Sequence, residues 1–406
     1  MSELLLLGVN GVLTTEQIKS LAGADLIVAG PHWQAQIALA APTLVTRWQA
    51  ITPLDAAIAT IGATLAATGK VVVLASGDPL FFGIGKHLLA RFPDVRTTIL
   101  PALSSVQLAC ARWRISWDDA RIISLHGRKL AHPGQLLRHE KTIVLTDKNN
   151  SPSRLAAVLL DYFSQIGEVE LPQKIEMLVA EDLALPEEKI TRLSLSAAMA
   201  RRFSPLNVIC LCLPDEFIQK PSFVFGLTEE DICHDAGMIT KNEVRAAVLH
   251  ALRLPETGIF WDIGGGSGSV SLEAARLAPD LAIYTIERQA ARLAAIKENI
   301  RRYRCFSVIP VAGEAPAALT PLPDPDRVFI GGGGPALADI VAAVSRRLRP
   351  GGRLVLTGVS AHTIQSGPKI VARHGFTVRT TEIHVRRDGA GGRKVFNPIT
   401  ITIGEK

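Results

Sequence analysis

The sequence predicts an α/β fold in two successive domains. Short apolar runs rich in β-branched residues alternate with amphipathic helical patterns along the whole chain, as in sheets covered by helices. The 406 residues exceed the usual size of one domain. A buried-strand pattern at residues 206–213 is followed by a stretch with two prolines and mixed charges. We therefore expect a first domain at 1–213, a linker at 214–224 and a second domain at 225–406.

The chain begins with an apolar strand pattern, in which residues 4–7 are leucines and Gly8 ends the run. A basic segment and a cleavage site are both missing, so we expect a buried strand and not a signal peptide. No apolar run reaches the roughly eighteen residues that a spanning helix needs, so we expect no membrane association. The five cysteines have no metal-binding spacing, and they fit a cytoplasmic location without a metal site. Cys210 and Cys212 lie on one strand face, as small apolar residues or, alternatively, as a redox pair.

The first domain also contains a strand, a tight turn and a helical pattern in succession. Residues 70–75 are apolar and β-branched, and apolar residues recur at helical spacing over 80–92. Gly77, Asp78 and Pro79 stand between the two patterns. They form either a plain type I or II turn with Asp-Pro chemistry or part of a ligand site.

Two threonines near the start of the second domain have the sequence context of helix caps. Thr228 precedes three acidic residues, which predicts the start of a helix. Thr240 and Glu243 match the capping-box pattern, so Thr240 is either a helix cap or a ligand contact.

A glycine-rich turn between a strand and a helix is the most informative segment. Its pattern is Asp-x-Gly-x-Gly-x-Gly, and its residues are Asp262, Gly264, Gly265, Gly266, Ser267 and Gly268. Glycines let a ligand lie against bare backbone because no side chain blocks close approach. The next apolar run ends in Glu287, which is placed to accept hydrogen bonds from ribose hydroxyls. Together these features indicate a cofactor that contains adenosine.

Two common nucleotide motifs do not fit this turn. Ser269 stands where the third glycine of the dinucleotide fingerprint belongs, and no Gly-Lys-Ser or Gly-Lys-Thr follows as in a P-loop. An ordinary glycine-rich turn is the alternative without a ligand. With Asp262 and Glu287, the turn resembles that of the class I methyltransferases. They bind S-adenosylmethionine with the loop under its amino-acid part and the acidic residue on its ribose.

The net charge of +6 comes with scattered arginines, and aromatic residues make up only 5% of the chain. No basic stripe is interleaved with aromatic residues, so we expect no nucleic-acid partner. A small-molecule substrate with several carboxylates suits this charge equally well.

Four stretches of the first domain resemble the tetrapyrrole methylases, the class III methyltransferase family. They are residues 71–85, 101–105, 126–128, and 178–183 with 186–190. The opening loop is Gly-Val-Asn-Gly, starting at Gly8, whereas the family's pattern is G-x-G-P-G. Because of this departure, we do not carry over the family's contact between this loop and the substrate. The resemblance implies a two-subdomain fold and one S-adenosylmethionine site. The implied contact residues are Gly77, Asp78, Pro79, Ser104, Ser105 and Glu181.

Three stretches of the second domain resemble the decarboxylating precorrin methyltransferases of cobalamin synthesis. They are residues 234–245, 313–316 and 326–334. The resemblance implies a Rossmann-like class I domain with a second S-adenosylmethionine site. Besides the glycine turn and Glu287, that site is expected to include Thr240, Glu314 and Ala315.

The two resemblances together imply a bifunctional methyltransferase acting on a tetrapyrrole. The second domain is expected to methylate carbon 15 of precorrin-6Y and to remove carbon dioxide from the acetate on carbon 12. The first domain is expected to methylate carbon 5, which gives precorrin-8X. Members of both families commonly self-associate, so we expect a homo-oligomer.

Decarboxylation needs an electron sink, which the conjugated substrate itself provides. The enzyme then has to hold the carboxylate and deliver a proton, and the candidates are His234, Lys241 and Arg245. The basic stretch at residues 386–394 is either a flap over substrate carboxylates or a solvated hairpin tip. Two other functions stay open: a class I RNA or small-molecule methyltransferase fused to an accessory α/β domain, and a non-catalytic pathway scaffold.

Overall fold

The structure is a computed structural model that describes residues 2–215, 224–235, 237–331, 334–389 and 392–406. Most of the predicted linker lies outside the described residues, as do Gly332 and Gly333 of the stretch at 326–334. Contacts between residues divide the chain into two compact units. Unit 1 comprises Met1–Lys129, Lys141–Ala156 and Glu176–Cys212, and unit 2 comprises Leu130–Glu140, Ala157–Ile175 and Leu213–Lys406.

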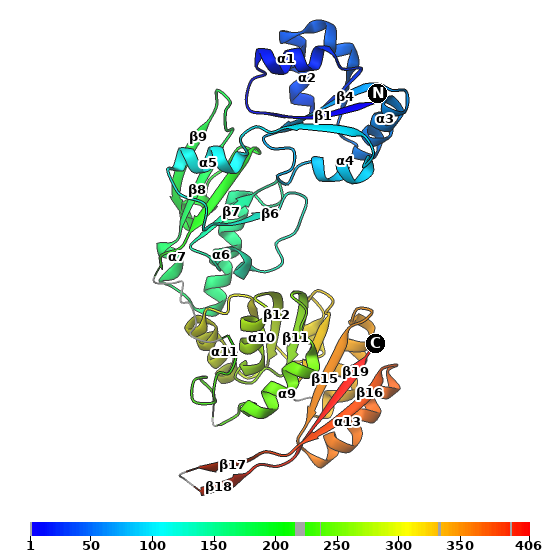
Figure 1. The fold of residues 1–406 in the computed structure, drawn as a ribbon. Coiled ribbons are helices and arrows are strands. Elements are labelled where there is room, and N and C mark those ends of the chain that lie inside the picture. Colours follow the sequence, from blue (N-terminus) through cyan, green and yellow to red (C-terminus); the bar gives the residue numbers. More distant parts are fainter. Residues whose placement is uncertain (1, 216–223, 236, 332–333, 390–391) are drawn as a thin grey trace. The chain divides into compact units, whose positions relative to one another are not determined.

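Unit 1 begins with a parallel sheet (Figure 1). Its strands, in spatial order, are β3 (Trp48–Ala50), β2 (Leu26–Ala29), β4 (Lys70–Ser76), β1 (Glu3–Val9) and β5 (Arg96–Leu100). The helices between them are α1 (Thr15–Ala22), α2 (Pro31–Ala40), η1 (Pro42–Arg47), α3 (Leu54–Ala66) and α4 (Gly85–Arg91). The leucines of β1 alternate between two cores: Leu5 packs with Trp33 of α2, and Leu6 packs with Ile61 of α3. The sheet is therefore buried on both faces, as continuous apolar strands require.

The second sheet of unit 1 is mixed. Its order is β6 (Arg121–Ser124), β7 (Lys141–Leu145), β10 (Asn207–Cys212), β8 (Glu176–Glu181) and β9 (Lys189–Ser194), with only β6 and β7 parallel. Helix α5 (Ser105–Trp113) packs on it through Val106 and Cys110, and α8 (Leu195–Met199) follows β9. Cys210 and Cys212 lie on one face of β10 with their sulfurs 3.8 Å apart, and both are free thiols.

Unit 2 is built on a doubly wound sheet. Its order is β13 (Val308–Ala312), β12 (Asp280–Glu287), β11 (Thr257–Ile263), β14 (Arg327–Ile330), β15 (Arg353–Gly358), β19 (Ile399–Glu405) and β16 (Thr377–Ile383). β19 runs antiparallel to β15 and β16 on either side of it, and the pairs from β13 to β15 are parallel. Strand order reverses between β11 and β14, and ligands of such sheets bind outside the carboxyl ends of the strands at that point.

Helices cover both faces of this sheet. They are α9 (Asn242–Leu252), α10 (Ser269–Leu277), α11 (Ala290–Tyr303), α12 (Leu337–Arg347) and α13 (Ala361–Arg373), with short turns η4 (Ala317–Leu319) and η5 (Gly334–Ala336). On one face, Trp261 and Val328 of the sheet pack with Ile340 of α12 and Val371 of α13. The predicted α/β class is confirmed, with two sheets in unit 1 and a Rossmann-like, doubly wound sheet in unit 2. No helix among the described residues has both the length and the apolar character needed to cross a membrane.

Residues 130–140 and 157–175, which we expected in the first domain, group with unit 2. They contain η2 (Pro133–Leu136), the second half of α6 (Pro152–Ile166) and α7 (Leu171–Lys174). The Tyr162 hydroxyl donates to the Val308 carbonyl over 2.8 Å, and its ring meets Phe306 edge-on. The expected domain end at residue 213 stays a prediction.

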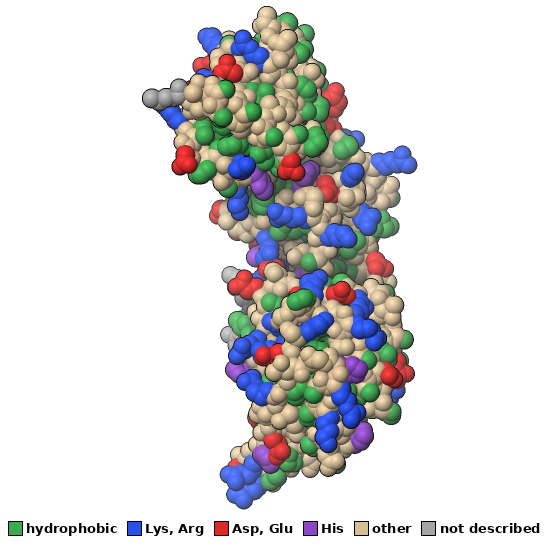
Figure 2. Space-filling model, turned by 90° about the vertical axis from the view of Figure 1, so that its right-hand side faces the viewer, with side chains coloured by type: hydrophobic (Ala, Val, Ile, Leu, Met, Phe, Trp, Pro, Cys, Tyr) green, Lys and Arg blue, Asp and Glu red, His purple; other side chains and the backbone are tan. Residues whose placement is uncertain are grey.

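A two-stranded hairpin of β17 (Arg386–Gly389) and β18 (Gly392–Val395) projects from unit 2 (Figure 1). Basic side chains are scattered over the face drawn in Figure 2, and they gather at the end of this hairpin. Arg386 at the base of the hairpin and Arg393 nearer its end both pair with Asp388, within the hairpin itself.

Two local predictions are wrong. The helix expected over 80–92 begins only at Gly85, because the carbonyl of Pro79 accepts the Gly85 N–H and the residues between form turns. Thr228 starts no helix, because its backbone N–H and hydroxyl both donate to the Asp231 carboxylate and close a turn instead.

Candidate functional site

The glycine turn joins β11 to α10 and is fastened to β12. The N–H groups of Gly264 and Gly265 both donate to the Ile286 carbonyl at 3.0 Å. Gly264, Gly266 and Gly268 have φ angles of 75°, 59° and 75°, a region that favours glycine. At these three positions the glycines of the sequence pattern are therefore explained by the backbone conformation of the turn.

Gly265 is required for a different reason. A Cβ atom at Gly265 would lie 2.3 Å from the Thr285 side chain of β12, whereas one at Gly266 would meet only the Met238 carbonyl at 3.8 Å. Gly265 therefore lets the turn pack against the sheet. Gly266 leaves bare backbone toward open space.

Glu287 ends β12 with its carboxylate fixed by backbone. Its two oxygens accept the N–H groups of Gly266 at 3.0 Å and Gln289 at 2.9 Å, and the residue is 4% exposed. Lone pairs stay available on both oxygens, since each accepts one such bond. The carboxylate is thus preorganised to accept further hydrogen bonds from a ligand.

Asp262 lies beneath the turn, 1% exposed. One oxygen accepts the Ser271 hydroxyl at 2.6 Å, and the other has no partner among the described residues. Burial raises the pKa of Asp262 to about 6, against the opposing hydrogen bond from Ser271. The side chain supports the turn from below and is not among the residues that line the cavity above it.

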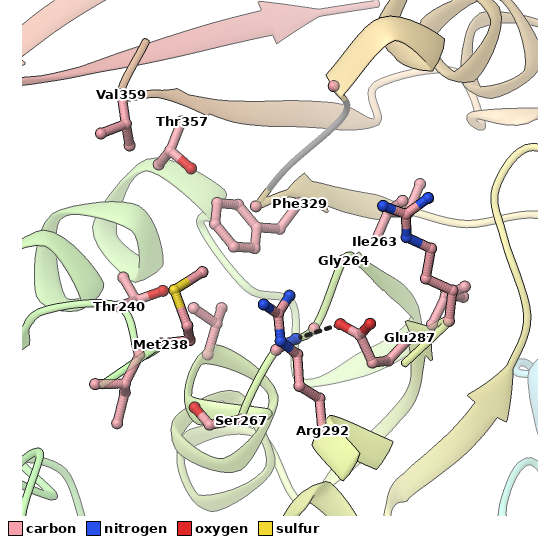
Figure 3. Close-up of a pocket in the computed structure, with 18 of the residues that line it drawn as sticks. Met238, Thr240, Ile263, Gly264, Ser267, Glu287, Arg292, Phe329, Thr357 and Val359 are labelled. Carbon is pink, nitrogen blue, oxygen red and sulfur yellow. Dashed lines mark hydrogen bonds between the residues drawn. The ribbon is translucent and has the colours of Figure 1, made fainter. Parts of the chain in front are cut away.

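A cavity of about 770 Å³ opens above the glycine turn (Figure 3). Most of the predicted second-domain site residues line it: Thr240, Lys241, Gly264, Gly265, Gly266, Ser267, Glu287, Glu314 and Ala315. The exceptions are Asp262, Gly268, His234 and Arg245, which are not lining residues. The volume falls within the range of small-molecule sites.

Thr240 does not cap α9. The N-cap position is Lys241, and no side chain closes the helix start. The capping-box interpretation is therefore wrong, and the Thr240 side chain is left to the cavity (Figure 3).

The cavity has lining residues that the sequence did not suggest: Met238, Arg292, Phe329, Phe396 and Asn397. Met238 adjoins the predicted Thr240, but the others come from separate elements that only the fold brings together. Figure 3 shows Arg292 reaching from the first turn of α11 into the cavity beside Glu287.

Lys241 belongs to an ionic cluster that ties the hairpin base to the cavity. Its ammonium pairs with Glu229 at 2.7 Å. Arg387 of β17 pairs with Glu229 at 2.6 Å and with Glu243 at 2.7 Å. The cations of Lys241 and Arg387 also lie 5.7 and 5.0 Å from the centre of the Phe396 ring. The hairpin is thus anchored at its base to α9 and to the segment before it.

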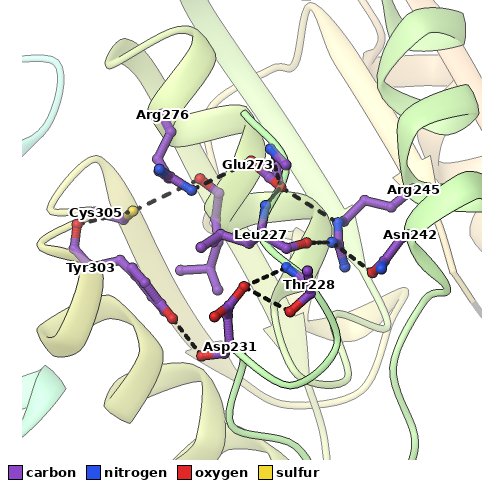
Figure 4. A network of polar contacts seen from close by, with 11 residues as sticks. Leu227, Thr228, Asp231, Asn242, Arg245, Glu273, Arg276, Tyr303 and Cys305 are labelled. Carbon is purple, nitrogen blue, oxygen red and sulfur yellow. Dashed lines mark hydrogen bonds and ion pairs between the residues drawn. The ribbon is translucent and has the colours of Figure 1, made fainter. Parts of the chain in front are cut away.

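Arg245 is buried in a separate network, drawn in Figure 4. It is 2% exposed, and its guanidinium donates to the Leu227 carbonyl and to Asn242. Glu273 of α10, fully buried, pairs with Arg245 at 3.8 Å and accepts the N–H of Leu227 at 2.6 Å. These contacts give Arg245 a positioning role for the segment that leads to the cavity.

Asn299 of α11 fixes the same segment to the glycine turn. Its amide donates to the carbonyls of Cys233 and Ser267 at 2.8 and 3.0 Å and accepts the Cys233 N–H at 2.9 Å. His234 follows directly, half-buried, with a ring Nδ1 that has no partner in the described part of the chain.

In unit 1, the predicted residues other than Glu181 follow the carboxyl ends of β4 and β5, beside the end of β1, whereas Glu181 ends β8 of the second sheet. Gly77 has a φ of 72°, and a Cβ on it would lie 3.1 Å from Ser104 Cα. A Cβ on Gly8 would lie 2.3 Å from the Gly77 carbonyl oxygen. The opening loop, the Asp-Pro turn and the start of α5 are therefore in close contact.

The polar side chains of this group are used locally. Asp78 accepts the Leu80 N–H at 2.8 Å, and Pro79 completes the turn. Ser104 caps α5 ahead of Ser105 in a capping box with Gln107. Glu181 ends β8, where it accepts the Ser204 N–H at 2.8 Å. Gly77, like Gly265, lets its turn pack closely, here against the start of α5.

The residues of unit 2 fit the S-adenosylmethionine that the turn suggests. The Ser267 hydroxyl is buried and unpartnered within the described chain, the backbone at Gly266 is bare, and Glu287 is held in place. A glycine cradle, a free polar atom and a fixed carboxylate are the groups that a nucleoside with an amino-acid tail needs.

Comparisons with known proteins show to which family the chain belongs. A family model described as "Tetrapyrrole (Corrin/Porphyrin) Methylases" matches residues 7–198, and one described as "Precorrin methyltransferase domain" matches residues 231–403. A Sinorhizobium protein named precorrin-6Y C(5,15)-methyltransferase [decarboxylating] is 35% identical, over 85% of this chain and 81% of its own. A protein of the same name from Mycobacterium tuberculosis (strain CDC 1551 / Oshkosh) is 30% identical, over 89% of this chain and 88% of the relative's length. A solved structure titled precorrin-6y C5,15-methyltransferase, from Geobacter metallireducens GS-15, is 36% identical with a TM-score of 0.45, over 46% of this chain and 100% of that one.

Proposed function

The chain belongs to the precorrin-6Y C(5,15)-methyltransferase (decarboxylating) family, and we propose that it methylates precorrin-6Y at carbons 5 and 15 and decarboxylates the acetate on carbon 12. The observation that carries the proposal is the cavity over the glycine turn in a chain that also contains a tetrapyrrole methylase domain. It is a methyltransferase of cobalamin biosynthesis, and we assign one S-adenosylmethionine site to each unit.

In unit 2, we assign carbon-15 methylation and decarboxylation to the cavity. S-adenosylmethionine, when bound, supplies an electrophilic methyl group. The turn at Gly264 and Gly266 and the carboxylate of Glu287 hold the nucleoside, and the surrounding apolar side chains limit water. Methyl transfer needs the acceptor carbon about 3–3.5 Å from the methyl group and in line with it, so positioning supplies most of the rate.

Lys241 is the candidate to hold the departing carboxylate and to return a proton. Of the three residues suggested by sequence, it alone lines the cavity. Its pairing with Glu229 keeps the ammonium in place at the wall. Arg245 acts, in this assignment, through the segment that it positions.

In unit 1, we assign carbon-5 methylation to the loops at Gly8, Gly77 and Ser104. The support is their close contact at the carboxyl ends of parallel strands, where α/β folds bind ligands. The expected self-association belongs to the proposal too, and light scattering of the purified chain measures it.

The decisive experiment is to incubate the chain with S-adenosylmethionine and precorrin-6Y and weigh the product. The expected product has gained two methyl groups and lost one carbon dioxide. Titration with S-adenosylhomocysteine is expected to saturate at two equivalents per chain. Unchanged substrate would end the enzymatic assignment, and a single equivalent would restrict it to one unit.

A further inference from the structure

The basic side chains that line the unit 2 cavity differ in whether a protein carboxylate pairs with them. Within the described part of the chain, three basic residues line it: Lys241, Arg288 and Arg292. Lys241 pairs with Glu229 and Arg288 pairs with Glu314, each at 2.7 Å. Arg292 makes neither an ion pair nor a hydrogen bond with any described residue, and its Nε is buried. Arg292 is therefore the cation that the cavity leaves free.

Glu287 does not neutralise Arg292, although both residues line the cavity (Figure 3). The Glu287 oxygens are held by the N–H groups of Gly266 and Gln289, and no ion pair joins the carboxylate to the guanidinium. Glu287 is also the residue that a ribose would engage. A guanidinium with a buried, unpartnered donor is costly unless an anion reaches it.

We propose that Arg292 binds a carboxylate side chain of the tetrapyrrole substrate and so orients the macrocycle over the cofactor cavity. The inference rests on the proposed function of unit 2. The planar guanidinium presents paired donors that match a carboxylate. Since Lys241 and Arg288 are already paired, Arg292 contributes a charge that no protein group competes for.

The position of Arg292 favours the substrate over the cofactor as the source of the carboxylate. Arg292 lies at the Glu287 end of the cavity, where the ribose belongs. Ribose and adenine carry no negative charge, and the carboxylate of S-adenosylmethionine belongs with the amino-acid part at the glycine turn. An anion beside Glu287 therefore comes from the substrate.

The chemistry also selects which substrate carboxylate Arg292 holds. Lys241 is already the candidate for the reacting acetate, whose negative charge is lost with carbon dioxide, so a second cation on that acetate would stabilise the ground state more than the transition state. Arg292 is therefore assigned to a carboxylate that survives the reaction. Its removal should weaken substrate binding without changing the ratio of carbon dioxide to methyl groups.

The test uses the full chain with Arg292→Gln, Arg292→Lys and, as a charge-matched control on the same helix, Lys297→Gln. For Arg292→Gln we expect KM for precorrin-6Y to rise roughly tenfold to a hundredfold, because a charged hydrogen bond is lost. The change in kcat should be smaller, and the affinity for S-adenosylhomocysteine should stay within about twofold. Arg292→Lys should recover part of the loss, and Lys297→Gln should match the wild type.

Each other outcome overturns the assignment in a recognisable way. Weaker binding of S-adenosylhomocysteine but not of 5′-methylthioadenosine, which lacks the carboxylate, would assign Arg292 to the cofactor. A selective loss of decarboxylation would assign it to the reacting acetate. An unchanged KM in a folded Arg292→Gln variant would remove its role. Wild-type chain that leaves precorrin-6Y unaltered would instead overturn the proposed function itself.

Discussion

Asp262 is a carboxylate that the fold holds in an unfavourable environment. It lies beneath the glycine turn with one oxygen bonded to Ser271 and one unpartnered within the described residues. Burial raises the pKa of Asp262 to about 6, whereas in the unfolded chain it is close to 4. Between these pH values the folded state keeps a proton that the unfolded state has released. The free energy of unfolding contributed by this group therefore falls as pH rises from about 4 to about 6.

Replacing Asp262 with Asn should remove this dependence. The difference in free energy of unfolding between Asp262→Asn and wild type should rise from pH 4 to pH 6 by roughly 3 kcal/mol at most, and then level off. Urea unfolding at a series of pH values measures it, with the exposed Asp339→Asn as the charge-matched control. A difference that stays flat between pH 4 and pH 7 contradicts the buried-carboxylate account.

Single residues also show what the sequence could and could not predict. Gly264, Gly266 and Glu287 were predicted because turn geometry and ribose recognition impose residue types at fixed spacing. Arg292 and Asn299 were missed, since their roles arise only when α11 packs beside the turn. One arginine among many has no sequence signal, and the signal here is its lack of a partner in the described fold.

At the scale of elements, the hairpin β17–β18 combines an anchored base with a projecting end. Arg387 fixes the base to Glu229 and Glu243, while the ion pair of Arg386, one residue earlier, is with Asp388 of the hairpin itself. The side-chain hydrogen bond from Arg387 lowers the pKa of Glu243. The stabilisation from that pair is therefore present at neutral pH and is lost as pH falls through the lowered pKa.

Breaking the anchor should loosen the hairpin without unfolding the unit. In Arg387→Gln, amide hydrogen exchange over the described hairpin residues should accelerate severalfold, because the lost pairs are partly exposed and worth about 1 kcal/mol. The neighbouring Arg386→Gln should exchange at the wild-type rate. Equal rates in all three proteins would show that the ionic cluster does not hold the element.

Helices and strands were predicted best where the hydrophobic pattern of the sequence matches the side chains that the core buries. The first strand is confirmed because its leucines alternate between two cores. The helix starts at residue 80 and at Thr228 were wrong because turn hydrogen bonds at Pro79 and Asp231 outcompete the helical pattern. Local hydrogen bonds of this kind, from backbone or side chain, involve few residues, so periodicity does not reveal them.

At the scale of the whole molecule, the two units should be separable by substitution. Gly77→Ala places a Cβ near Ser104 at a positive φ and should impair unit 1 alone. The expected product keeps the decarboxylation and gains one methyl group in place of two, by mass spectrometry. Gly351→Ala, at a φ of 73° with free space around it, carries the same backbone cost as a control. A variant that loses both methylations would contradict independent sites.

The buried carboxylate of Glu273 limits where a stable carboxy-terminal fragment of the chain can begin. The backbone N–H groups of Gly226 and Leu227 donate to it, and both lie before residue 231, where the match to the precorrin methyltransferase model begins. A carboxy-terminal fragment that starts at residue 231 would lack these two donors. The buried carboxylate of Glu273 would then lose two of its hydrogen bonds, which destabilises the fragment. Fragments that begin before Gly226 should therefore yield more folded protein on expression than fragments that begin at residue 231.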